Sequence, residues 1–384
     1  MKYSNRVAVC FYSAFVFALL ILFPFILLLH KDIAYYAYKE MTYDIIISDI
    51  CKGVKGTKDQ AILINNFLYH YFSSPHNAIV QDKDIYSDII RGVAWCDQRA
   101  WALATFMGKL GTEARMVFTK NKEGISTHTV SEVLIDNKWS LFDPQFGFFA
   151  YNAQGEIASY DDICRSPSLF LSSRNMSKLR RIDTARFLKT KESFISNIYY
   201  ENYPEPLLWK SPVLSRNFSR KIVSTIIDMY VHFLGQRFVN VYQDVFFKFY
   251  LSQNNSAQLY ARAKNYELFS RLTLAISEYE KVIKNFPESL EAQDSRYFLG
   301  ILYSKAGKAN LSIQALKHLL NRFPDTQWQA PVYYYLGCNY ELLGDYSYAI
   351  DYYKKALNLY KESNPDSLVS DELKVIERIS GLLK

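Results

Sequence analysis

The longest apolar stretch of the chain lies at its beginning. Residues 7–29 are 23 residues without a charge, preceded by Lys2 and Arg6. A helix of this length crosses a hydrocarbon core of about 30 Å, because each residue adds about 1.5 Å. No small-residue cleavage site follows, which favours an uncleaved signal anchor over a cleaved signal peptide. Residues 1–32 are therefore predicted to form a single transmembrane helix, and the basic residues before it place the main body outside the cytoplasm.

Two stretches beyond a stalk that is expected to be mobile repeat their apolar residues at helical spacing. The first covers residues 57–72. The second covers residues 96–110 and is followed by Gly111, a residue type that commonly ends helices. Cys96 lies in the first turn of this second helix. The unpaired N–H groups of that turn favour a thiolate, although a lone cysteine on an apolar helix face is more often part of a core.

A β-hairpin is predicted downstream of this helix. Residues 126–147 alternate apolar and polar positions and are rich in β-branched residues, with an Asp-Asn turn pair at 136–137. If those two residues form the loop, His128 shares a face with Asp143 and is its diagonal neighbour, roughly 7–8 Å away. A register slip of one residue would put these two side chains on opposite faces.

Cys96, His128 and Asp143 together have the residue types of a nucleophile, a base and the group that orients the base. The imidazole would hold or remove the thiol proton, and the carboxylate would fix the tautomer and stabilise the imidazolium. Each residue alone has an ordinary structural explanation. The three residues in this order, on a helix followed by a two-stranded hairpin, favour catalysis by a cysteine nucleophile.

The segments that carry these residues, "WCDQRAWALATFMGKLGTEARMVF" and "HTVSEVLIDNKWSLFDPQFG", resemble the core of the transglutaminase-like superfamily. The family pattern is a Cys that opens a helix, a Gly-x-x-Ala-Arg-x-Val strand, a His followed by Glu-Val, and a Trp-x-x-x-Asp-Pro. The resemblance implies a papain-like α+β domain at about residues 40–165. It also implies that Cys96, His128 and Asp143 are catalytic in acyl transfer or hydrolysis at amide bonds, as in a cysteine protease.

Metal ions and cofactors are not expected. The five cysteines form no CxxC pair, no His stands at metal-ligand spacing, and no calcium loop of the D-x-D-x-D-G type occurs. Peptide N-glycanases of the same superfamily carry zinc-binding cysteine pairs, which this sequence lacks. One disulfide, between Cys51 and Cys164, is conceivable.

The C-terminal third repeats itself every 37 residues. Three series carry the period: Tyr266, Tyr303 and Tyr340; Ile276, Ile313 and Ile350; Phe286, Phe323 and Tyr360. Helix-length segments flank each turn, so residues 257–384 resemble tetratricopeptide repeats, with a capping helix at 366–384. The resemblance implies an all-α domain whose concave face binds a protein or peptide partner, or one that serves as a structural spacer.

The connector at 166–256 differs in charge from the rest of the chain. The segment from Arg174 to Lys221 contains 11 Lys and Arg residues and 4 Asp and Glu residues. Its excess of positive charge equals the net charge of the whole chain, +7. Such a block suits anionic lipid headgroups, an acidic polymer or the acidic face of a partner, or is a solvated linker surface. Residues 222–251 are apolar but interrupted by charges, which favours amphipathic helices broken near Gly235 over a second membrane span. These helices would pack on the repeats or lie on a membrane surface beside the basic block.

Two functions remain open at this stage. The first is a membrane-anchored cysteine hydrolase or acyltransferase whose repeats recruit a protein partner. The second is a non-catalytic envelope assembly protein that uses the repeats and a transglutaminase-like binding fold. Nucleic-acid binding is not expected, because the sequence contains no nucleic-acid-binding motif and begins with a predicted membrane anchor.

Overall fold

The computed structural model describes residues 29–73, 85–120, 126–166, 218–251 and 255–363, with a few further positions at 169, 199–200, 375, 378–379 and 381–382. The apolar run at 7–29 lies outside the described residues except for Leu29, and so does nearly all of the basic block. Within the part of the chain that is described, no helix has the length and apolar character needed to cross a membrane.

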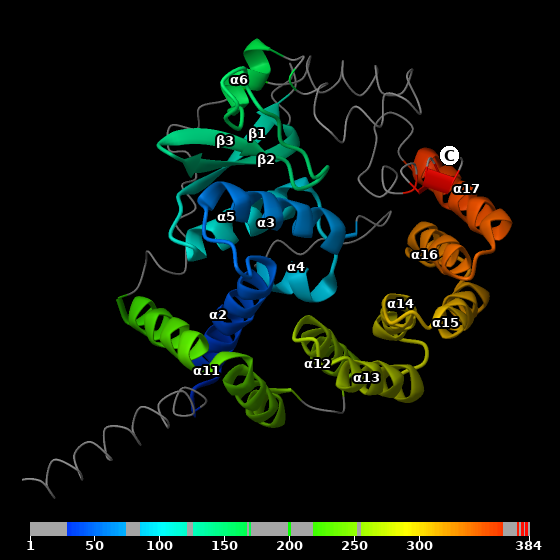
Figure 1. Ribbon diagram of the computed structural model, residues 1–384. Coiled ribbons are helices and arrows are strands. Elements are labelled where there is room, and N and C mark those ends of the chain that lie inside the picture. Colours follow the sequence, from blue (N-terminus) through cyan, green and yellow to red (C-terminus); the bar gives the residue numbers. More distant parts are fainter. Residues whose placement is uncertain are drawn as a thin grey trace, which may run out of the picture.

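An N-terminal unit of helices and a small sheet is followed by an arc of paired helices (Figure 1). The N-terminal unit comprises α2 (Lys31–Ile50), α3 (Thr57–Tyr71), α4 (Ile85–Arg91), α5 (Cys96–Lys109), β1 (Ala114–Lys120), β2 (Ser126–Ile135), β3 (Lys138–Phe142), α6 (Tyr160–Arg165) and β4 (Tyr199–Tyr200). The remaining helices are α11 (Phe218–Tyr250), α12 (Ser256–Leu268), α13 (Leu272–Asn285), α14 (Leu290–Lys305), α15 (Ala309–Arg322), α16 (Gln329–Leu342) and α17 (Tyr346–Ser363).

The sheet has the strand order β3-β2-β1-β4, and all its pairs are antiparallel. The predicted hairpin is confirmed with its register, because Leu134 lies opposite Trp139 and Glu132 opposite Leu141. Asp136 and Asn137 have φ values of 50° and 63°, the left-handed conformations that a two-residue hairpin loop requires. Helix α5 packs against β1 and β2, so its first turn lies beside the sheet.

The segment before α3 is a buried helix and not the mobile stalk expected from the sequence. Helix α2 buries residues on all its sides, among them Tyr38, Met41 and Ile46. It is covered by α11, which the chain reaches only after the sheet. Helix α11 breaks at Gly235 (φ 63°), as predicted, and it packs on the rest of the protein through residues such as Tyr242.

A buried polar cluster joins the N-terminal unit to the repeats. The hydroxyls of Tyr38 on α2 and Tyr86 on α4 both donate to Oδ1 of Asn265 on α12, each over 2.8 Å. Nε2 of Gln243 on α11 donates to the same Tyr38 hydroxyl over 2.6 Å. Four helices from distant parts of the sequence therefore meet at one set of hydrogen bonds, which fixes how they pack.

A second polar contact ties α2, α5 and α11 together. The ammonium group of Lys109 lies 3.0 Å from Glu40, 2.7 Å from Asp44 and 3.0 Å from Asp228. Burial raises the pKa of Asp44 to about 7, and repulsion from Asp228 adds to the rise while Lys109 opposes it.

The period of 37 residues is confirmed by the paired helices. Helices α13, α15 and α17 begin at Leu272, Ala309 and Tyr346, at that spacing. A Cβ on Gly300 or Gly337 would lie 2.5 Å from Leu316 or Tyr353 of the next helix, which explains why small residues recur where the helices cross. At the far end, the described residues between 366 and 384 are helical.

The conceivable disulfide is not made, because Cys51 is a buried free thiol.

Candidate active site

His128 and Asp143 are hydrogen-bonded to each other. Nε2 of His128 lies 2.7 Å from Oδ2 of Asp143, whose side chain is fully buried, whereas the imidazole is 15% exposed. His128 is on β2 and Asp143 follows β3 directly. Ser131 lies opposite Phe142 in the hairpin. Because successive side chains alternate between the two faces, the next residue, Asp143, has its side chain on the same face of the sheet as His128.

A tight turn holds the Asp143 carboxylate in place. Its Oδ1 accepts the backbone N–H of Gln145 over 2.9 Å, and the backbone groups of Asp143 and Phe148 exchange two hydrogen bonds of 2.9 Å. The ring of Phe146 lies 5.6 Å from the imidazole of His128, centroid to centroid. The turn therefore positions the carboxylate and an apolar cover over the imidazole together.

Cys96 begins α5, and its side chain is partly exposed. Burial raises the pKa of its thiol, but the hydrogen bond to His128 and the charge of that imidazole outweigh burial, and the backbone N–H of Thr129 stabilises the thiolate further. The pKa of Cys96 is consequently lowered from its ordinary value. A lowered pKa makes the nucleophilic thiolate more abundant near neutral pH.

The imidazole carries the opposite shift. Burial lowers the pKa of His128, yet the charge and hydrogen bond of Asp143, followed by the contact with Cys96, raise the pKa well above its usual range. Both shifts favour the charged forms, an imidazolium between the thiolate and the carboxylate.

The backbone in front of Cys96 is held by a buried arginine. Nε of Arg99 donates to the carbonyl of Ala94 and its Nη2 to the carbonyl of Phe72, both over 3.1 Å. Ser73 extends this support, because it exchanges hydrogen bonds with the backbone of Gly92 and Ala94. This contact could not be predicted from the sequence, in which Arg99 is one more polar position of a helix.

Gln98 lies close enough to Cys96 in the sequence to be a candidate donor to a reaction oxyanion, but it has a different role in the structure. Its Oε1 accepts the backbone N–H of Trp95 over 3.1 Å, and its Nε2 donates to Asp97 over 3.1 Å. The amide therefore caps the start of α5. The backbone N–H groups of the first turn are the donors that point toward this end of the helix.

The other residues of the family-like pattern form a separate group. Arg115 and Glu132 are opposite each other on β1 and β2, and their side chains form an ion pair of 2.6 Å. The guanidinium of Arg115 lies 4.1 Å from the ring centre of Trp139 on β3. This ladder links the three strands through side chains, so these residues of the pattern have a structural role.

Where a thiol contacts an imidazole and the imidazole contacts a carboxylate, the thiol can give its proton to the imidazole and take it back without the help of solvent. Within the described residues, no group of three or more His, Cys, Asp and Glu side chains is placed to hold a metal ion.

Comparison with known families concerns the helical repeats. Two profiles described as tetratricopeptide repeat match residues 259–289 and 291–362, the latter spanning α14 to α17. Residues 259–362 are therefore tetratricopeptide repeats, a fold that commonly binds protein partners. The comparison with curated proteins gives no match.

Proposed function

We propose that this protein is a transglutaminase-like cysteine enzyme that cleaves or transfers acyl groups at amide bonds, and that its repeats recruit a protein partner. The single observation that carries the proposal is the continuous contact from Cys96 to His128 to Asp143. Nε2 of the imidazole is hydrogen-bonded to Asp143, so Nδ1 is the nitrogen that can exchange a proton with the thiol.

The first step is the attack of the Cys96 thiolate on an amide carbonyl. A C–S bond forms, the carbonyl π bond becomes an oxyanion, and backbone N–H groups of the first turn of α5 are suited to stabilise that charge. The imidazolium of His128 then donates its proton to the leaving nitrogen, and the C–N bond breaks. The products are a thioester on Cys96 and a free amine.

The second step returns the enzyme to its starting state. A water molecule or an amine gives its proton to the now neutral His128 and attacks the thioester. The C–S bond breaks and the thiolate re-forms beside the imidazolium. Water as acceptor makes the enzyme a hydrolase or protease, and an amine makes it an acyltransferase.

The predicted anchor at residues 1–32 places this chemistry at a membrane, with the main body outside the cytoplasm. In the same proposal, the basic block between 174 and 221 faces anionic lipid or an acidic polymer. These parts of the proposal rest on the sequence alone.

The test is the rate at which iodoacetamide alkylates Cys96 of the full-length protein across pH, followed by peptide mapping. Cys51 and Cys338 serve as internal controls, since burial raises the pKa of both thiols. We expect Cys96 to react at lower pH than either control, and His128→Ala to remove the difference. If Cys96 reacts no faster than Cys338, or if His128→Ala reacts like the wild type, the proposed chemistry is wrong.

The second candidate function, a non-catalytic assembly protein, is favoured by the family match, which covers the repeats. It predicts that the full-length Cys96→Ser variant retains the biological activity of the wild type. The alkylation test separates the two, because a scaffold has no need of an ionised thiol.

A further inference from the structure

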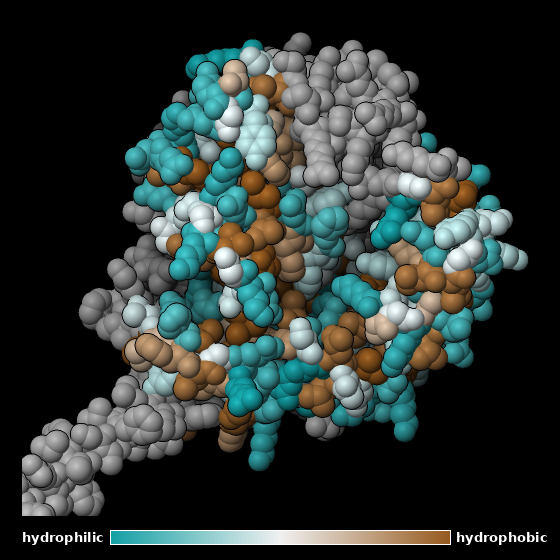
Figure 2. All heavy atoms as spheres, in the orientation of Figure 1, coloured by the Kyte–Doolittle hydropathy of each residue, from teal (hydrophilic) through white to brown (hydrophobic). Residues whose placement is uncertain are grey.

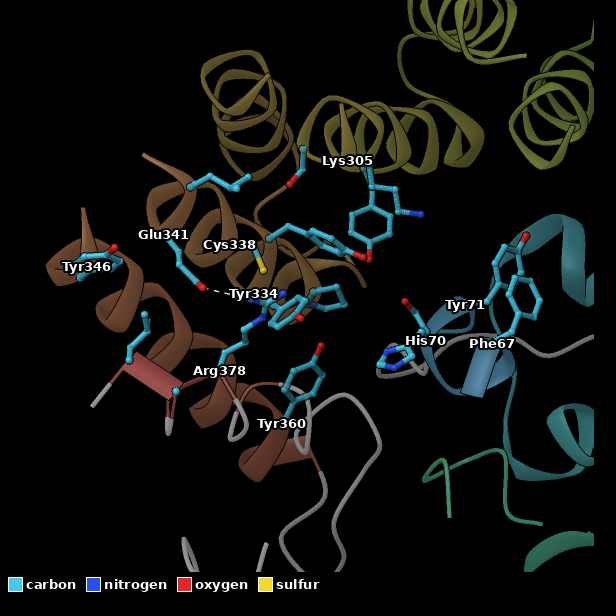
Figure 3. A pocket seen from close by; sticks show the side chains of 18 residues that line it. Phe67, His70, Tyr71, Lys305, Tyr334, Cys338, Glu341, Tyr346, Tyr360 and Arg378 are labelled. Atoms are coloured by element: carbon cyan, nitrogen blue, oxygen red, sulfur yellow. Dashed lines mark hydrogen bonds and ion pairs between the residues drawn. The ribbon is translucent and has the colours of Figure 1, made fainter. Parts of the chain in front are cut away.

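A cleft of about 860 Å³ lies between the C-terminal end of α3 and the inner side of the repeats. The surface is hollowed between the N-terminal unit and the arc of helices (Figure 2), and the lining side chains face one another from the two sides (Figure 3). Phe67, His70 and Tyr71 come from α3, whereas Tyr334 and Tyr335 come from α16. The cleft is therefore shared by both parts of the protein.

The cleft occupies only part of the inner side of the repeats. At the beginning of the arc, α4 packs against α12, and Gly92 lies so close to the ring of Phe298 and the ammonium of Lys264 that a Cβ there would meet them at 3.3 and 3.7 Å. The N-terminal unit fills this end. The open part is bordered by α14, α16, α17 and the C-terminal residues.

Among the described lining residues of the open part, positive charge predominates. Lys305 and Arg378 line it, and the one carboxylate among these described residues, that of Glu341, is paired with Nη1 of Arg378 over 3.2 Å. The side chain of Arg378 is 49% exposed and extends toward Glu341 beside Tyr334 (Figure 3). A guanidinium has five N–H donors in a planar fork, so it can receive a carboxylate in addition to Glu341.

The wall of the cleft is connected to the segments that carry Cys96 and His128 at two places. Ser73 lines the cleft and bonds to the backbone of Ala94, which is two residues from Cys96 and thus within about 8 Å along the chain. At the second place, His70 of the lining contacts Tyr69, which belongs to the same apolar cluster as Phe146. Phe146 in turn covers the imidazole of His128.

We propose that this cleft binds the substrate itself: an extended, acidic polypeptide segment whose carboxylate pairs with Arg378 and whose apolar side chains contact the lining tyrosines. This inference rests on the proposed function, and it changes the role of the repeats. They hold the chain that Cys96 attacks, and the partner they recruit is the substrate.

The binding experiment uses the full-length Cys96→Ala protein, which retains peptides without processing them. The probe is a displayed library of random peptides of about twelve residues, roughly 40 Å when extended. We expect the retained peptides to be enriched in Asp and Glu, and their affinity to fall about tenfold or more in the added variant Arg378→Glu, which replaces a charged hydrogen bond by repulsion. No enrichment, or the same enrichment with Arg378→Glu, overturns the inference.

A matched control is Arg322→Glu. Arg322 is exposed to nearly the same extent, 47%, and is also paired with a glutamate, Glu288, but it lies on α15 and does not line the cleft. It should retain the wild-type selection, which excludes a general effect of charge reversal on the repeats.

The connection to Cys96 is tested by adding the selected peptides to the wild type during alkylation. Bound peptide should slow the alkylation of Cys96 in the wild type and have no effect in Arg378→Glu. Peptides that bind without protecting Cys96 overturn the substrate role alone. A Cys96 that is unreactive even without peptide overturns the proposed chemistry and the substrate role with it.

Discussion

The carboxylate of Asp143 lies 2.7 Å from the Nε2 atom of His128, although the two residues are 15 positions apart. Neither could reach the other without the two-residue loop at Asp136 and Asn137, which sets the register of the hairpin. The first prediction follows from this contact.

Asp143→Asn should shift the reactivity of Cys96 to higher pH. The charge of Asp143 raises the pKa of His128, and the imidazolium in turn lowers the pKa of the thiol. Without that charge, the ion pair is weakened in favour of neutral thiol and imidazole, and alkylation at pH 6.5 should slow about tenfold. The rate at pH 10 should be unchanged. A variant whose profile coincides with that of the wild type would contradict the geometry.

Asp44→Asn should make the protein more stable in alkaline buffer. The pKa of Asp44 is about 7 in the folded state, above its value of about 3.9 in unfolded chains. The folded state favours the protonated carboxyl, so Asp44 contributes its full stabilisation below about pH 4. This contribution is lost as the pH rises through 7. The asparagine side chain stays neutral, so the advantage of the variant in free energy of unfolding should grow by on the order of 2 kcal/mol between pH 5 and pH 8.

Urea unfolding at the two pH values measures that difference. Asp49→Asn is the control, because Asp49 is on the same helix but exposed. The interpretation of the Lys109 cluster is wrong if both variants show the same pH dependence as the wild type.

Gly337→Ala should destabilise the repeats. The added Cβ would lie 2.5 Å from the ring of Tyr353, so α16 and α17 must separate, at a cost of about 1–3 kcal/mol. Gly108→Ala is the matched control within a helix, since a Cβ there meets nothing within 4 Å. That change should stabilise by about 0.5–1 kcal/mol. Thermal unfolding followed by circular dichroism compares them, and equal effects would contradict the tight crossing.

Ser270→Gly should stabilise the first repeat. Gly307 and Gly344 occupy the turns of the later repeats with φ of 70° and 76°, and Ser270 has φ of 56° at the corresponding position. A Cβ in this region costs about 1–2 kcal/mol, and part of the gain from its removal is offset by the freer unfolded chain. The reciprocal change Gly307→Ser should destabilise. A loss of stability in Ser270→Gly would show that its side chain has a role of its own.

The elements that depend on local sequence could be predicted. The apolar stripe before Gly111, the Asp-Asn pair at 136–137 and the spacing from Tyr266 to Tyr303 each encode a local structure, and each is confirmed by α5, the β2–β3 hairpin and the helix pairs. Local periodicity also sufficed to put His128 and Asp143 on one face.

The contacts between distant segments could not be predicted. Helix α2 buries Lys39 and Glu40 beside its apolar residues, so no one-sided stripe marked it as a packed helix. Nothing near Asn265 indicates that it would accept two tyrosine hydroxyls from the other end of the chain. The cleft has the same origin, since its walls come from α3 and α16 and exist only once both are in place.

The pairing of α2 with α11 has a consequence for biosynthesis. A ribosome releases α2 early, but the residues that cover it, Phe218–Tyr250, emerge only after the whole sheet has been made. Until then the side of α2 that packs on α11 remains uncovered and open to misassociation. The nascent N-terminal unit therefore completes its folding late, at a time set by translation of the connector, and a ribosome stalled before residue 218 would hold a chain that chaperones recognise.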